Sequence, residues 1–142
     1  MKAKLFADGG SRGNPGPAAS GAVLYGEDGA VLAEVGDYLG IATNNVAEWQ
    51  ALRTGLERAR DLGVHDITIR LDSELVVRQV TGVYKVKHAD LIPLAAKVKA
   101  LLRNFASVDI AHVPRKENAA ADALVNRVLD DAAENGRAGL SG

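Results

Sequence analysis

Residues 2–17 read KAKLFADGGSRGNPGP, and this stretch decides how the chain begins to fold. Residues 2–8 read as a strand, and the run of Gly, Asn and Pro that follows predicts that the strand ends there. Two further strands are expected at about 20–27 and 30–39, joined at Asp28-Gly29, a dipeptide typical of tight hairpin turns. The chain is therefore expected to open with a three-stranded antiparallel meander.

Helices and strands alternate in the rest of the chain. A helix is predicted over about 44–62, with Asn44 or Asn45 as its N-cap. The later elements expected are a strand at 66–71, a helix capped by Asp72 or Ser73 and ending near Val80, a helix over about 90–103, a strand at 107–113 and a helix over about 118–133. This order implies an α/β fold with a mixed five-stranded sheet and helices on both faces.

Composition narrows the class of protein. The chain has 142 residues, of which 47% are hydrophobic and 25% charged, as in one ordinary folded domain. It contains no cysteine, which excludes disulfides, thiolate nucleophiles and Cys-based metal sites.

No stretch resembles a signal peptide or a membrane span, so we expect a soluble, cytoplasmic, monomeric protein without membrane contact. Residues 1–134 are expected to form the domain, and residues 135–142 a flexible tail or the start of a linker to a further C-terminal domain.

Basic residues are concentrated in one segment, although the net charge is only −1. Between Tyr84 and Lys116 there are seven Lys or Arg and two Asp, so the remainder of the chain is acidic. A basic segment on an acidic body can hold the phosphates of a nucleic acid. A solvated helix face explains the same segment equally well.

Glu48 is the one charged residue inside the apolar arc of the helix predicted over 44–62. A buried carboxylate without a partner is strongly unfavourable, so a bound cation or an ion pair must offset its charge. The alternative is a first-turn glutamate that is favoured by the helix dipole and reaches solvent.

Three more acidic residues stand at the ends of elements. Asp8 and Asp72 each end a strand, and Asp122 lies in the first turn of the last helix. Each has an ordinary explanation, in turn chemistry, helix capping and the helix dipole respectively. If all three converge with Glu48 at one end of the sheet, their repulsion requires cations between them. Oxygen ligands alone favour Mg²⁺ or Mn²⁺, and a pair of such ions is the usual device for phosphodiester displacement.

Over about residues 2–133 the chain resembles the type 1 ribonuclease H (ribonuclease HI) family, and four short motifs carry the resemblance. They are Asp8–Pro17, Thr43–Glu48, Leu71–Ser73, and Asn118 with Asp122 followed by Ala123-Leu124. The resemblance implies a ribonuclease H-like fold and a metal-dependent endonuclease that hydrolyses the RNA strand of RNA–DNA hybrids, leaving 5′-phosphate and 3′-hydroxyl ends. It also implies two Mg²⁺ ions per site, with Mn²⁺ as a substitute, ligated by the four catalytic carboxylates Asp8, Glu48, Asp72 and Asp122.

The resemblance further implies contacts to the hybrid. The residues concerned are Gly9, Gly10, Ser11, Asn14, Thr43, Asn44, Asn45 and Asn118. Among them, Asn14, Asn44 and Asn45 would contact the minor groove, where short amides can bond the 2′-hydroxyl that distinguishes RNA from DNA. Thr43 would lie in a phosphate pocket for the DNA strand. Cap and turn chemistry is the alternative explanation for these residues.

Two features depart from the family pattern. Many members carry a histidine in the loop before the last helix, but residues 114–118 contain none, and Arg115 is predicted to contact phosphate instead. His112, within the preceding strand, is expected to be structural. Some members also insert a basic, tryptophan-rich protrusion. The short segment found here is expected to contact the DNA strand through Tyr84, Lys85 and Lys87, with weaker and more salt-sensitive binding.

The main alternative function is a non-catalytic hybrid- or RNA-binding module of the same fold. Four clustered carboxylates argue against it, because negative charge weakens the binding of a polyanion. An unrelated nucleotide-binding fold is disfavoured because the chain has no G-x-x-x-x-G-K-[ST] phosphate loop.

Overall fold

The computed structural model describes the backbone of residues 1–141 and the side chains of residues 1–135. Within this part of the chain the elements follow one another as β1 (Lys2–Ser11), β2 (Gly16–Gly26), β3 (Val31–Ala42), α1 (Asn44–Asp61), β4 (Asp66–Leu71), α2 (Glu74–Val80), α3 (Ile92–Leu102), β5 (Ser107–His112), the 3₁₀ turn η1 (Arg115–Asn118) and α4 (Ala119–Ser141). The strands form one sheet in the order β3-β2-β1-β4-β5. The first three are antiparallel, whereas β1, β4 and β5 are mutually parallel, which confirms the predicted mixed sheet.

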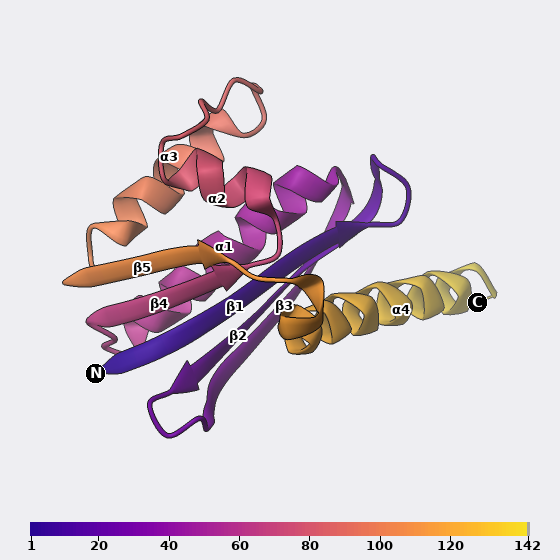
Figure 1. The fold of residues 1–142 in the computed structure, drawn as a ribbon. Helices are drawn as coiled ribbons and strands as arrows, with labels where there is room; N and C mark the ends of the chain where they lie inside the picture. The colour runs from indigo at the N-terminus through magenta and orange to yellow at the C-terminus, as the bar shows by residue number, and fades with distance from the viewer. Residues whose placement is uncertain (142) are drawn as a thin grey trace.

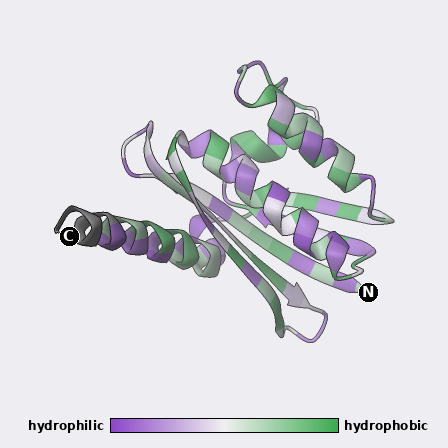
Figure 2. Ribbon diagram, turned by 180° about the vertical axis from the view of Figure 1, so that it is seen from behind, coloured by the Kyte–Doolittle hydropathy of each residue, from purple (hydrophilic) through white to green (hydrophobic). Residues whose placement is uncertain are grey.

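The helices lie on both faces of the sheet, as predicted (Figure 1). Helices α1, α2 and α3 cover one face, where the main core is centred on Leu5, Trp49 and Leu52. Helix α4 crosses the other face and packs through a separate small set of side chains that includes Leu124 and Val125. Figure 2 shows apolar and polar residues alternating along α4, as expected for a helix with one face on a sheet.

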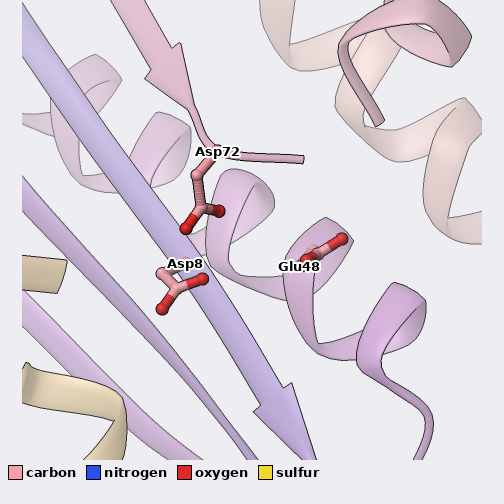
Figure 3. A group of neighbouring side chains, drawn as sticks. All are labelled: Asp8, Glu48 and Asp72. Carbon is pink, nitrogen blue, oxygen red and sulfur yellow. The ribbon is translucent and has the colours of Figure 1, made fainter. Parts of the chain in front are cut away.

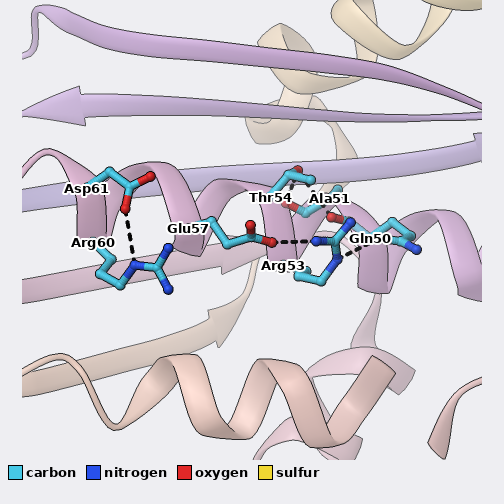
Figure 4. A network of polar contacts seen from close by, with 7 residues as sticks. All are labelled: Gln50, Ala51, Arg53, Thr54, Glu57, Arg60 and Asp61. Atoms are coloured by element: carbon cyan, nitrogen blue, oxygen red, sulfur yellow. Dashed lines mark hydrogen bonds and ion pairs between the residues drawn. The ribbon is translucent and has the colours of Figure 1, made fainter. Parts of the chain in front are cut away.

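The outward face of α1, away from the predicted apolar arc, carries a polar network. Arg53 donates to Gln50 Oε1 at 2.8 Å and pairs with Glu57, one turn away on each side (Figure 4). Near the helix end, Arg60 pairs with Asp61 at 3.1 Å. The charged residues of α1 therefore face solvent, and Glu48 is set apart from them.

Two predicted boundaries were wrong at the start of the chain. Strand β1 does not end at Asp8, because Gly9, Gly10 and Ser11 pair with Ser20, Ala19 and Ala18 of β2. The N-cap of α1 is Thr43, whose hydroxyl accepts from the Val46 backbone N–H at 3.2 Å. Asn44 cannot take that role, because its side-chain oxygen accepts instead from the backbone N–H of Ser11 at 2.8 Å.

The end of the chain also differs from expectation. Helix α4 continues to Ser141, whereas the sequence predicted an end near Ala133 and a patternless tail. Gly136 and Gly139 each weaken a helix by about 1 kcal/mol relative to Ala, but no proline breaks it. The last residue of the predicted tail, 142, lies outside the described residues.

No helix in the part of the chain that the structure describes is long and apolar enough to cross a membrane.

Candidate active site

Three carboxylates from three elements meet at one end of the sheet. Asp8 lies on β1, Glu48 in the second turn of α1, and Asp72 immediately after β4. Each offers an oxygen atom that lies within 4.8 Å of the others, and Figure 3 shows Asp8 and Asp72 turned toward each other beside Glu48. Asp8 is only 8% exposed, and the other two are partly buried.

The backbone explains why these three side chains meet. Strands β1 and β4 are parallel neighbours, with Ala7 paired to Leu71, so the next residue of each is an aspartate at the same height. Glu48 reaches them because α1 begins directly against β1. A Cβ atom on Gly9 would lie 2.2 Å from the Ala47 backbone carbon and 2.3 Å from the Glu48 nitrogen, so only glycine permits this approach.

Asp122, the fourth predicted carboxylate, stands at the edge of this group. It lies in the first turn of α4 with its side chain 34% exposed, and it is not among the three that share the 4.8 Å cluster. Helix α4 comes close to the sheet where Gly21 of β2 leaves room, since a Cβ there would lie 2.8 Å from the Ala121 backbone oxygen. The structure thus brings all four predicted carboxylates to one cleft, with Asp122 on the opposite wall from Glu48.

The electrostatics of the site favour a bound cation. Burial raises the pKa of Asp8 to about 8, followed as causes by the charge of Asp72, a side-chain hydrogen bond with Asp122, and the charges of Asp122 and Glu48. Burial also raises the pKa of Glu48 to about 7, with Asp72 adding to the rise and a hydrogen bond from Ser73 opposing it. Because the donor set consists of crowded carboxylate oxygens, the residues fit a hard divalent cation such as Mg²⁺.

The carboxylates open into a cleft of about 500 Å³. The residues predicted to bind substrate that line it are Gly9, Gly10, Ser11, Asn44 and Arg115. Arg115 stands at the rim, 83% exposed, with Nη2 3.8 Å from Asp122 Oδ1. Its position is compatible with the predicted contact to phosphate.

A second hollow of about 500 Å³ lies beside the cleft and shares Asn44 with it. The other predicted residues that line it are Asn14, Thr43, Asn45, Lys85 and Lys87. These residues come from three distant parts of the chain, and the structure brings hydroxyl, amide and ammonium groups to one place. We refer to this hollow as the Thr43 groove.

Tyr84 is placed elsewhere. Its ring lies 5.5 Å from the Arg78 guanidinium, and it lines a different hollow along α3. Tyr84 and Lys87 therefore line different hollows, and their predicted common contact to the DNA strand stays a prediction. Lys85 borders both hollows.

Asn118 does not line the cleft either. It is 1% exposed, and its amide donates to the Ala7 backbone oxygen at 2.9 Å. A side chain so deeply buried cannot touch a hybrid, so its predicted role in substrate binding is withdrawn. His112 lies within β5, as predicted, where it is the last residue, and its side chain is exposed.

Three residues near the site were not predicted. Arg12 and Asn126 line the cleft, and Gln79 lines the Thr43 groove while accepting from Trp49 Nε1 at 3.3 Å. Asn126 could have been found, since it lies one helical turn after Asp122 and donates to the Asp122 backbone oxygen at 3.1 Å. Nothing in the local sequence marks Gln79.

Comparisons with known proteins agree with this geometry. A sequence profile of the family described as "Reverse transcriptase-like" matches residues 6–128. The structure is similar to that of the N-terminal RNase H domain of Rv2228c from Mycobacterium tuberculosis, with a TM-score of 0.91 and 46% identity over 96% of this chain and 99% of that one. The fold and its carboxylate cleft therefore define a domain of the ribonuclease H class.

Two further proteins narrow the class to a family. The chain is 50% identical to "Ribonuclease HI" of Halobacterium salinarum over 127 residues, which are 89% of this chain and 64% of that protein. It is 42% identical to LC11-RNase H1, solved in complex with an RNA/DNA hybrid, with a TM-score of 0.86 over 92% of this chain and 98% of that one. The chain belongs to the ribonuclease HI family. It spans less than two thirds of the Halobacterium protein and 38% of the full-length Mycobacterium tuberculosis protein.

Proposed function

We propose that this protein is an endoribonuclease that hydrolyses the RNA strand of RNA–DNA hybrids and leaves 5′-phosphate and 3′-hydroxyl ends. The observation that carries the proposal is the convergence of Asp8, Glu48 and Asp72 within 4.8 Å, with Asp122 across the same cleft. A module that only binds nucleic acid would lose affinity by presenting four carboxylates to a polyanion. The hybrid bound to LC11-RNase H1 supports the choice of substrate.

The four carboxylates would hold two Mg²⁺ ions, with Mn²⁺ as a substitute. Such ions, when bound, lower the pKa of a coordinated water and stabilise the charge that develops on the leaving oxygen. The chain contributes the rigid placement of the ligands, because Asp8 lies on the central strand and Asp72 directly follows the parallel strand beside it.

The cleft and the Thr43 groove would hold the two strands of the hybrid. The RNA strand would lie against the backbone of Gly9 and Gly10, while Thr43 and the ammonium groups of Lys85 and Lys87 would bind phosphates of the DNA strand. Asn44 borders both hollows, so it lies where the minor groove between the strands would pass. Arg115, at the rim of the cleft, would contact phosphate of the RNA strand.

Cleavage of a strand-labelled hybrid tests the proposal. We expect the wild-type protein to cut the RNA strand with Mg²⁺ and to leave it intact with a chelator, and Asp8→Asn to be inactive with either. Binding of the hybrid without cleavage in Mg²⁺ and in Mn²⁺ would replace the proposal by the non-catalytic module. The limits 1–134 for the catalytic domain, a monomeric state and a cytoplasmic location are parts of the same proposal.

A further inference from the structure

The loop between β1 and β2 joins the two walls of the cleft. Toward α1, the Ser11 backbone N–H donates to Asn44 Oδ1 at 2.8 Å, and the Asn44 backbone N–H donates to Asn14 Oδ1 at 3.1 Å. Toward α4, Arg12 Nη2 lies 2.6 Å from Asp130 Oδ1 and 3.5 Å from the Asn126 backbone oxygen. One short loop therefore contacts both the helix that carries Glu48 and the helix that carries Asp122.

The contacts of Arg12 lead along α4 to the catalytic cleft. Asp122, Asn126 and Asp130 are spaced four residues apart, so they lie on one face of the helix. Asn126 donates its side-chain amide to Asp122, at 3.1 Å to the backbone oxygen and 3.4 Å to Oδ2. Arg12 spans the next turn of the same face, between Asn126 and Asp130.

The loop itself has little freedom to move. Its ends are closed by the Arg12 backbone N–H, which donates to the Pro17 oxygen at 2.8 Å. A Cβ atom on Gly16 would lie 2.3 Å from the Arg12 backbone oxygen, so the chain is packed against itself at this point. A side chain on such a loop is a firm anchor for a helix that packs on the opposite face of the sheet from α1 (Figure 1).

We propose that Arg12 is a positioning residue, whose ion pair with Asp130 clamps α4 to the β1–β2 loop and so holds Asp122 in place relative to Asp8, Glu48 and Asp72. The inference rests on the proposed nuclease function and goes beyond it. Both partners are substantially exposed, at 43% and 68% of their side chains, so the pair contributes little to global stability. Its effect is expected on the rate of the chemical step, which is sensitive to small displacements of a catalytic group.

The test compares single, double and charge-swapped variants. Arg12→Ala and Asp130→Ala are each expected to lower kcat about fivefold, the equivalent of a surface ion pair, with KM unchanged. The double variant is expected to be no slower than either single variant, and Arg12→Asp combined with Asp130→Arg is expected to recover most of the wild-type rate. Asp131→Ala, at the exposed neighbouring position of α4, is the matched control and is expected to leave kcat unchanged.

Measuring hybrid binding without turnover distinguishes the proposed positioning role of Arg12 from a direct contact between Arg12 and the substrate. Affinity for the hybrid is measured in chelator at several salt concentrations, and each variant is melted to confirm its fold. If Arg12 acts only by positioning α4, Arg12→Ala should bind the hybrid with the affinity and the salt dependence of the wild type. If Arg12→Ala weakens binding and lowers the salt slope by about 1, while Asp130→Ala does neither, Arg12 is a phosphate contact and the clamp is wrong. Wild-type turnover in every variant would also overturn the positioning role of Arg12 but would leave the proposed nuclease function standing. An inactive wild-type protein would overturn both proposals.

Discussion

The side-chain amide of Asn118 donates a hydrogen bond of 2.9 Å to the backbone oxygen of Ala7, the residue that precedes Asp8. Asn118 is the last residue of η1 and directly precedes α4. This hydrogen bond therefore links the start of α4 to the central strand β1, next to Asp8. The same bond satisfies a carbonyl that lies in the interior, because Ala7 is 2% exposed.

We expect Asn118→Ala to lower the free energy of unfolding by about 1–3 kcal/mol, because the buried hydrogen bond between Asn118 and Ala7 can no longer form. Urea titration of the metal-free protein measures this change. Glu117→Ala, at the exposed preceding position, is the control and is expected to be nearly neutral. A variant with wild-type stability but weaker hybrid binding would restore Asn118 to the substrate site.

Glu48→Gln is expected to reduce kcat at least about 100-fold while the fold is retained. The amide keeps the size of the side chain but removes a negative ligand from the cluster of three. Cleavage rates in Mg²⁺ and the melting temperature in chelator are the two measurements. Loss of folding would instead support a structural role for Glu48, the alternative that the sequence left open.

The raised pKa values predict how stability changes with pH in the absence of metal. The folded state holds protons on Asp8 up to about pH 8 and on Glu48 up to about pH 7, above their ordinary values of 3.8 and 4.5. Their contribution to stability is therefore present in acid and is lost as the pH rises through the folded values. Asp8→Asn removes the titration of Asp8, so in chelator its melting temperature should exceed that of the wild type by an amount that grows from pH 5 to about pH 8.5.

The same titration couples metal binding to proton release. Mg²⁺ should raise the wild-type melting temperature more at pH 8 than at pH 6, because fewer protons must leave the carboxylates at the higher pH. Equal shifts at both values would show that Asp8 is already ionised in the metal-free protein.

Asp122 and Asp72 are expected to differ in their effect on metal binding. Asp72 belongs to the cluster within 4.8 Å, whereas Asp122 stands at its edge. Asp122→Asn should therefore keep a metal-induced rise in melting temperature while losing activity, and Asp72→Asn should lose both. Titration calorimetry with Mg²⁺ and Mn²⁺ is the direct measurement. Loss of all metal binding in Asp122→Asn would place Asp122 in the primary site.

The lysines of the Thr43 groove are expected to bind phosphate. Lys85→Ala combined with Lys87→Ala should weaken hybrid binding and reduce the slope of log affinity against log salt by about 2, because each lysine would neutralise one phosphate. Lys2→Ala combined with Lys4→Ala removes the same charge at the opposite end of β1 and serves as the control. A similar weakening in both double variants would show that net charge alone, rather than the groove, determines affinity.

The sequence was informative about the fold wherever the signal was local. Alternating strands, the Asp28-Gly29 turn and the apolar arc of α1 predicted the sheet and most helices, and Glu48 was identified because it interrupted that arc. The glycines after Asp8 were misassigned to a turn, since a glycine needed for close packing looks the same in sequence as one needed for a bend.

The remaining errors concern contacts between distant residues. Asn118 lies in a motif whose other member, Asp122, faces the cleft, and only the tertiary structure shows that its own amide points to Ala7, 111 positions earlier. Arg12 was passed over for the same reason, because its partner Asp130 lies on the last helix. Lys85 and Lys87 were found from their charge, but their proximity to Thr43 required the fold.

Strand β1 is hydrogen-bonded along both edges, to β2 on one side and β4 on the other. Fraying of the outer strands β3 and β5 leaves it intact, and α1 and β4 pack into the same main core. The cluster of Asp8, Glu48 and Asp72 is therefore carried by elements that share the main core, and we expect it to come apart only when that core opens. Asp122 belongs to a helix that packs through smaller, separate sets of side chains, so we expect its place in the site to depend on the contacts of Asn118 and Arg12 as well as on packing.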